Sequence, residues 1–195
     1  MKNMPCSTIG IMAIFSIFTL NTHATLVDFS NMGTFQTNVL SLTHLTITGS
    51  ADLNIRNLNG FGVIGGYSDK AIDSSEFVTF NFDYTATDIK YYVMAAGGLG
   101  ATPGILGEAF LEAFDSGGAP LGVLDISGTG WHRVSEEFGN VPLSSFRVTA
   151  NVDNHSIHDM SYNATIPEPA TALLLGIGGL GAWFLRRNKT NLPKI

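Results

Sequence analysis

Two histidines and an aspartate near the end of the chain have side chains from which proteins build transition-metal sites. They are His155, His158 and Asp159, and imidazole nitrogens and carboxylate oxygens are common metal ligands. Such sites need three or four ligands with supporting hydrogen bonds. No distant partner stands out, although His44 and His132 are also in the chain. A polar loop before the last strand explains the same residues, so we assign no metal to them.

Acidic side chains also gather in a short segment that follows Gly65-Gly66. Oxygen-rich loops can bind calcium, and the candidate ligands are Asp69, Asp73, Glu76 and, if the first and last regions meet, Asp159. Their spacing does not fit the EF-hand loop. We therefore expect solvated acids and no cofactor, with a calcium site as the alternative.

Candidate catalytic groups are few. Glu108 and Glu112 form a carboxylate pair that would share a face on a helix or on a strand. Glycosidases do use two carboxylates, about 5–10 Å apart, but solvated surface acids are the commoner interpretation. The chain has no nucleophile elbow, phosphate loop or zinc-protease motif. We predict no catalytic residues and no enzymatic activity.

Three aromatic residues, Tyr91, Tyr92 and Trp131, could form a platform that stacks on sugar rings. Aromatic side chains in a β-sandwich more often fill the core. An exposed cluster of coplanar rings would favour carbohydrate binding, whereas a buried Trp131 and Tyr91 would favour a structural role.

The segments that must position these residues alternate apolar and polar side chains with the period of two that strands require. Phe77–Tyr84 is a clear case, with Val78, Phe80, Phe82 and Tyr84 on one face. Further strands are predicted at Leu45–Thr48, Ile89–Val93, Leu121–Ile126, Trp131–Val134 and Phe146–Asp153. Glycines punctuate most of the gaps, and together these features predict an all-β sandwich.

One segment, Glu108–Asp115, is ambiguous. Its residue types allow two turns of helix, but Phe110 and Phe114 also alternate against Leu111 and Ala113. A turn at residues 115–118 follows, so we favour a strand that enters a hairpin.

The N-terminal segment has the features of a secretory signal peptide. Lys2 precedes the apolar run Ile9–Leu20, which ends before the small-residue site Thr22-His23-Ala24. The run is short for a membrane span, which needs about 20 apolar residues. We predict cleavage after Ala24 by signal peptidase, which leaves Thr25 as the first mature residue.

The C-terminal segment combines two prolines, an apolar run and a basic cluster. Pro167-Glu168-Pro169 is followed by the glycine-containing run 170–185 and then by Arg186-Arg187. Prolines favour an extended backbone before the run, and the basic residues should stay in the cytoplasm. The run predicts a single transmembrane helix.

This tail resembles the PEP-CTERM sorting domain in three features that occur in fixed order over residues 166–189. The resemblance implies a Gram-negative, exopolysaccharide-producing bacterium in which the tripeptide Pro167, Glu168 and Pro169 is the recognition signal for exosortase, a membrane-embedded cysteine transpeptidase-like enzyme. It also implies that Arg186 and Arg187 end the membrane-spanning part of the signal. An ordinary membrane anchor is the alternative interpretation.

The middle of the chain resembles the jelly-roll domains found in PEP-CTERM proteins. The resemblance is loose and rests on Gly60–Val63, Gly65-Gly66, Ile72–Glu76, the Phe77–Tyr84 strand and a closing strand within Asp153–Tyr162. It implies a jelly-roll-like β-sandwich.

The predicted domain between the two ends is acidic and has no cysteine. Residues 25–165 hold fifteen acidic and five basic side chains, a net charge of −10 against −6 for the whole chain. This charge argues against nucleic acid and anionic lipid as partners. The one cysteine, Cys6, lies in the predicted signal peptide, so burial of a core must stabilise the mature domain.

The expected organisation is therefore a signal peptide at 1–24, a β-sandwich extracellular domain at 25–165, a sorting signal with its transmembrane helix at 166–189 and a cytoplasmic tail at 190–195. We expect an exported protein, anchored transiently in the inner membrane and then found at the cell surface or outside the cell. Its function is expected to be a structural or adhesive role in the extracellular matrix and biofilm. The alternative is a carbohydrate-binding module that holds exopolysaccharide.

Overall fold

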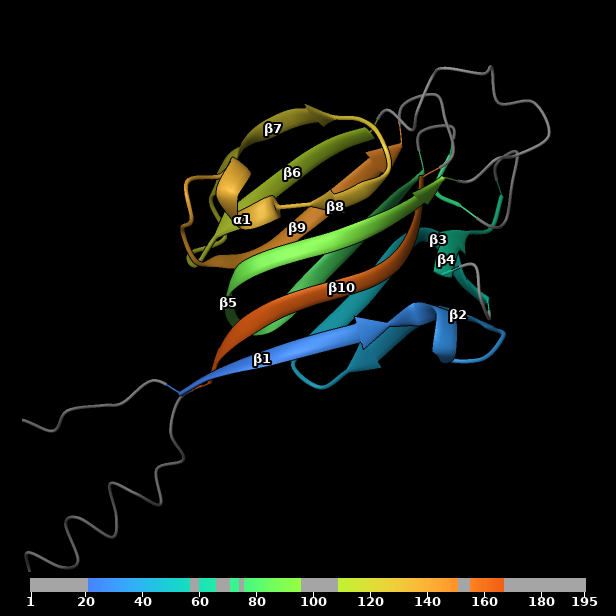
Figure 1. The fold of residues 1–195 in the computed structure, drawn as a ribbon, viewed down its shortest axis with the longest axis horizontal. Coiled ribbons are helices and arrows are strands. Elements are labelled where there is room, and N and C mark those ends of the chain that lie inside the picture. The colour runs from blue at the N-terminus through green and yellow to red at the C-terminus, as the bar shows by residue number, and fades with distance from the viewer. Residues whose placement is uncertain are drawn as a thin grey trace, which may run out of the picture. The chain divides into compact units, whose positions relative to one another are not determined.

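A computed structural model of the protein describes residues 21–56, 60–65, 71–73, 76–95, 109–150 and 155–166. Most of these residues belong to strands (Figure 1). The elements are β1 (Asn21–Asp28), the 3-10 turn η1 (Phe29–Asn31), β2 (Phe35–Leu42), β3 (Leu45–Arg56), β4 (Gly60–Val63), β5 (Phe77–Ala95), β6 (Ala109–Asp115), β7 (Pro120–Ile126), β8 (Gly130–His132), the short helix α1 (Val134–Glu137), β9 (Leu143–Ala150) and β10 (His155–Ile166).

The ten strands belong to one hydrogen-bonded network, whose main path runs β1-β10-β4-β3-β5-β9-β6-β7. β2 pairs with β3 and β8 pairs with β5 outside this path, and β10 also pairs with β5. Because β4 pairs with both β3 and β10, the strands β5, β3, β4 and β10 form a closed ring of pairings. The pairs among β2 to β10 are antiparallel.

The long strand β5 connects two layers. Its first half pairs with β3 and β9, and its second half pairs with β10 and β8. Rings from the two sets of strands meet in the core: the centroids of Phe82 and Tyr162 are 5.1 Å apart, and those of Tyr91 and Phe146 are 6.0 Å apart. The all-β sandwich that the sequence predicts is confirmed.

A bulge in β5 explains how both of its halves face the core. Val78 and Phe80 are buried in the first half, and Ile89 and Tyr91 in the second, so the buried positions change from even to odd numbers. Asp88 lies at the change with a φ of +48°. Between the paired positions Thr87–Asn163 and Lys90–Ser161, β5 advances by three residues and β10 by two, so β5 contains one extra residue. An extra residue in one strand reverses the side-chain alternation, and this reversal matches the bend between the layers.

The short helix α1 corrects one sequence prediction. The segment Trp131–Val134 was predicted as a strand, but β8 ends at His132 and Val134 begins α1. The helix completes the β5 bulge, because Ser135 Oγ accepts a buried hydrogen bond of 2.8 Å from the Ile89 N–H. A buried backbone N–H such as that of Ile89 needs a hydrogen-bond acceptor, and Ser135 supplies one where no neighbouring strand does.

The ambiguous segment is a strand over the part that the structure describes. β6 covers Ala109–Asp115, with Leu111 and Ala113 buried and Phe110 exposed. It forms a hairpin with β7, in which Asp115 Oδ1 accepts the N–H groups of Gly117 and Ala119. The strand preference is confirmed, while Glu108 lies outside the described residues.

The described chain forms a compact unit over Thr22–Ile166, close to the predicted domain at 25–165. β1 begins at Asn21, so the predicted cleavage after Ala24 falls within this strand. The apolar run of the predicted signal peptide lies outside the described residues, as does the predicted tail from residue 167 on.

Within the described residues, no helix has the length and apolar character needed to cross a membrane.

Candidate functional site

A second bulge brings two potential metal ligands to one face of the sandwich. Along β10, Ile157 pairs with Val93, whereas Asp159 already pairs with Tyr92. The strand therefore contains one extra residue, His158, at this point. Residues next to each other in a regular strand point to opposite faces, but a bulge re-aims a side chain. Both His158 and Asp159 are half-buried, and His158 Nδ1 lies 2.9 Å from Asp159 Oδ2.

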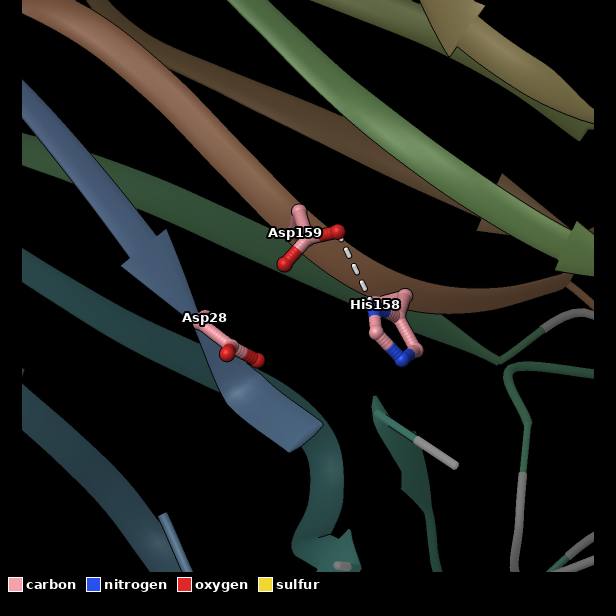
Figure 2. A group of neighbouring side chains, drawn as sticks. All are labelled: Asp28, His158 and Asp159. Carbon is pink, nitrogen blue, oxygen red and sulfur yellow. Dashed lines mark hydrogen bonds and ion pairs between the residues drawn. The ribbon is translucent and has the colours of Figure 1, made fainter. Parts of the chain in front are cut away.

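A third ligand comes from the other end of the described chain. Asp28 is the last residue of β1, and β1 pairs with β10. One ligand atom from each of Asp28, His158 and Asp159 lies within 4.8 Å of the other two. Figure 2 shows Asp28 on β1 and the other two side chains on β10, with their polar atoms turned toward the same space. We call these three residues the outer cluster.

Two neighbouring residues support the outer cluster. Ser30 Oγ donates a hydrogen bond to Asp28 Oδ1, which restricts that carboxylate. Gly60 has a φ of +72°, and a Cβ there would overlap the carbonyl oxygen of Ile157 and lie 2.8 Å from the Cα of His158. Only a glycine fits this close approach, so the start of β4 packs directly against the bulge.

An aromatic row continues from the outer cluster across the same face. The Tyr92 ring lies edge-on to His158, with centroids 6.3 Å apart, and edge-on to Trp131 at 5.5 Å. Trp131 is 46% exposed, and Lys90 Nζ lies 5.7 Å from its ring centroid. The rings of Tyr92 and Trp131 meet at 66°, so the described aromatics form an exposed row but not a coplanar platform.

His155 does not join His158 and Asp159, although the sequence places it three residues away. It is fully buried, and its ring lies 5.8 Å from Tyr91 and 5.9 Å from His132. We call Tyr91, His132 and His155 the inner cluster. In a regular strand His158 would lie on the face opposite His155, whereas Asp159 would share the face of His155. The bulge turns Asp159 to the side of His158, so the transition-metal set considered from the sequence is divided between the core and the surface.

Tyr91 is the centre of the inner cluster. Its ring stacks on His132 at 5.3 Å, and within the described part of the chain its buried hydroxyl has no hydrogen-bond partner. Burial raises the pKa of Tyr91 well above its usual range, because the phenolate would lose its hydration. This residue therefore packs in the core and does not offer a face to a sugar.

The residues considered as calcium ligands do not come together in one site within the described part of the chain. Asp73 is buried, its N–H donates to Glu76 Oε2 at 3.1 Å, and its carbonyl accepts the Glu76 N–H at 2.8 Å. Glu76 thus closes a turn, which is a structural use of its carboxylate. Asp159 belongs to the outer cluster instead, and Asp69 lies outside the described residues.

Glu112 has a structural partner. It lies opposite Arg147 on β9, and its Oε2 is 3.6 Å from Arg147 Nη1. Cross-strand pairs of opposite charge stabilise a sheet modestly. The other half of the carboxylate pair, Glu108, lies outside the described residues.

The structure therefore assembles one site that the sequence suggested only in part. His158 and Asp159 were candidates from their residue types, whereas Asp28 was not. The one local signal for Asp28 is an acidic residue at the end of the apolar pair Leu26-Val27, which is too common to identify a ligand.

The sorting residues Pro167, Glu168, Pro169, Arg186 and Arg187 lie outside the described residues. Comparison with family models matches residues 165–188 to the PEP-CTERM protein-sorting motif. These limits differ by one residue at each end from the predicted limits, 166–189.

A search of curated proteins found no match. Among solved structures, the chain is similar to a structure described as GH31 CBM32-2 bound to GalNAc, with 10% sequence identity and a TM-score of 0.28. The alignment covers 73% of this chain and 95% of that chain. The chain therefore carries a PEP-CTERM protein-sorting motif at residues 165–188, which supports the resemblance to exosortase substrates that the sequence predicts.

Proposed function

We propose that this protein is exported, held briefly in the inner membrane by its tail, cleaved by exosortase and delivered to the cell surface or medium. There its β domain acts as a structural or adhesive component of the extracellular matrix. The observation that carries the proposal is the sorting motif at residues 165–188, which begins where β10 ends at Ile166.

The arrangement of the chain supports this proposal. The compact unit ends at Ile166, so a cut in the tripeptide Pro167-Glu168-Pro169 would leave every described strand intact. The apolar run 170–185 and the basic Arg186-Arg187 would hold the tripeptide at the outer edge of the inner membrane before cleavage. The extended backbone that the two prolines predict also suits a processing enzyme.

Substitution of Glu168 tests the proposal. In a host with active exosortase, Glu168→Ala should leave an uncleaved chain in the inner membrane, and deletion of exosortase should have the same effect on the wild type. Glu137→Ala is the matched control, because Glu137 is an exposed acid on α1, and it should be processed normally. Fractionation with mass spectrometry of both ends reads out the result. Wild-type chain that keeps Arg186-Arg187 in the membrane would show that the tail is only an anchor.

A second candidate function is carbohydrate binding by the exposed aromatic row, and the observation in its favour is Trp131. This side chain is 46% exposed on β8 and lies against Tyr92 on β5. Sugar rings stack on exposed aromatic faces of this kind, and the Lys90 ammonium nearby could donate to hydroxyl groups.

Affinity electrophoresis in gels that contain the host exopolysaccharide tests this candidate. Trp131→Ala should reduce retardation by about five-fold or more, since an aromatic contact contributes about 1 kcal/mol. Phe110→Ala removes a comparably exposed aromatic from β6 and should leave retardation unchanged. Equal behaviour of Trp131→Ala and the wild type would exclude the row as the binding face.

A further inference from the structure

We propose that the outer cluster, Asp28, His158 and Asp159, is a binding site for a divalent first-row transition metal such as zinc. Three potential ligand atoms, one from each residue, lie within 4.8 Å of one another. They come from β1 and from the β10 bulge (Figure 2). None of the three residues belongs to the sorting motif at residues 165–188, and the proposal does not depend on the function proposed above.

The spacing of the ligand atoms suits a small cation. Zinc holds nitrogen and oxygen ligands at about 2.0–2.2 Å, which in tetrahedral geometry separates them by about 3.3 Å. His158 Nδ1 and Asp159 Oδ2 are 2.9 Å apart as a hydrogen-bonded pair, so a metal bound by both atoms would replace the proton between them, which is released to solvent. Asp28 is exposed at the end of its strand, and one of its ligand atoms lies within 4.8 Å of those of His158 and Asp159.

The backbone holds two of the ligands in place before a metal arrives. His158 and Asp159 share a face because of the bulge, and Gly60 packs against the backbone of that bulge. The Tyr92 ring lies edge-on to the imidazole at 6.3 Å, and Ser30 donates to the Asp28 carboxylate. Supporting contacts of this type orient metal ligands.

The ligand types select the class of metal. Calcium and magnesium prefer sites made of oxygen, whereas an imidazole nitrogen suits zinc, copper, iron and nickel. One imidazole and two carboxylates leave at least one coordination position open, as in zinc sites that bind water or another ligand. The net charge of −10 over residues 25–165 also favours the approach of a cation.

Metal binding would link two strands that are far apart in the sequence. Asp28 ends β1, and β10 is the last strand before the sorting motif. If cleavage occurs after Ala24, only Thr25–Asp28 remain of β1, and a metal bridge to β10 would hold this short remnant. We therefore expect metal to stabilise the folded domain, because a ligand that binds only the native state raises its stability.

The test uses the full-length protein in detergent, with an affinity tag that contains no histidine, after treatment with EDTA and dialysis. Zinc chloride should bind with a stoichiometry near one in calorimetric titration and raise Tm by several degrees. Cobalt chloride should produce visible d–d absorption bands. His158→Ala and Asp28→Asn should each weaken zinc binding by about ten-fold or more and abolish the cobalt bands.

A matched control is His44→Ala. His44 also faces an aspartate, with His44 Nδ1 3.8 Å from Asp83 Oδ2, but in the described part of the chain this pair belongs to no group of three potential ligands. This variant should bind zinc like the wild type. The proposal is wrong if the wild type takes up no zinc, if folded His158→Ala and Asp28→Asn bind it unchanged, or if calcium binds equally well without need for His158.

Discussion

His155 and His158 lie three residues apart on β10, yet they belong to regions with different properties. His155 is fully buried beside Tyr91 and His132. His158 is half-buried on the outer face, beside two carboxylates that approach it from β1 and β10. The comparison teaches that in this sandwich the face of the strand on which a side chain lies, and not its type, separates packing from possible chemistry.

The largest expected effect is at the inner cluster. His155→Ala should reduce the free energy of unfolding by about 2–5 kcal/mol, because it empties a fully buried site between aromatic neighbours. Urea unfolding of the full-length chain, followed by tryptophan fluorescence, measures the change. A loss below about 1 kcal/mol would mean that the interior histidine is not needed for packing.

The next effect concerns the contact that supports the bulge. Gly60→Ala should cost about 1–3 kcal/mol, because a Cβ at φ +72° would overlap the Ile157 carbonyl. Urea unfolding of this variant measures the loss. The substitution should also weaken zinc binding by displacing His158.

The matched control for this contact is Gly118→Ala. Gly118 has a similar φ of +79°, and a Cβ added there would meet no atom within 4 Å, so the substitution measures backbone strain alone. Equal losses of stability in the two variants would show that the contact with β10 is unimportant.

A smaller effect is expected from the tyrosine of the inner cluster at high pH. The folded pKa of Tyr91 is raised by burial above the unfolded value, so above about pH 10 the unfolded state loses the proton first and stability falls as pH rises. Tyr91→Phe should remove up to about 1.4 kcal/mol per pH unit of this fall. At neutral pH the variant should be nearly neutral, since the hydroxyl lacks a partner in the described chain. Urea unfolding at a series of pH values measures the slopes, and identical slopes above about pH 10 would contradict this explanation.

The smallest effect is expected at the outer cluster without metal. His158→Ala should change the free energy of unfolding by less than about 0.5 kcal/mol in EDTA, because a partly exposed hydrogen bond contributes little. The same variant should be clearly less stable than the wild type when zinc is present. Thermal unfolding under both conditions measures the difference, and a large loss in EDTA would indicate that the residue is structural.

Local sequence patterns predicted much of the fold. Alternation over Phe77–Tyr84 and after Phe146 corresponds to strands β5 and β9, since a half-buried strand requires a period of two. The same reasoning favoured a strand at β6. It failed at Val134, which is buried like a strand residue but begins α1. The reason is tertiary, because the helix supplies Ser135 to the Ile89 N–H.

By itself, the sequence determined the all-β class, the acidic charge of the domain and the sorting motif at residues 165–188, because each depends on residue types over a continuous segment. Only the tertiary structure decided that Asp28 meets His158 and Asp159, and that Asp159 faces away from His155. The first depends on pairing between β1 and β10, and the second on the bulge opposite Tyr92. Neither a long-range pairing nor an inserted residue leaves a periodic pattern in the chain, so both become visible only when the strands are placed side by side.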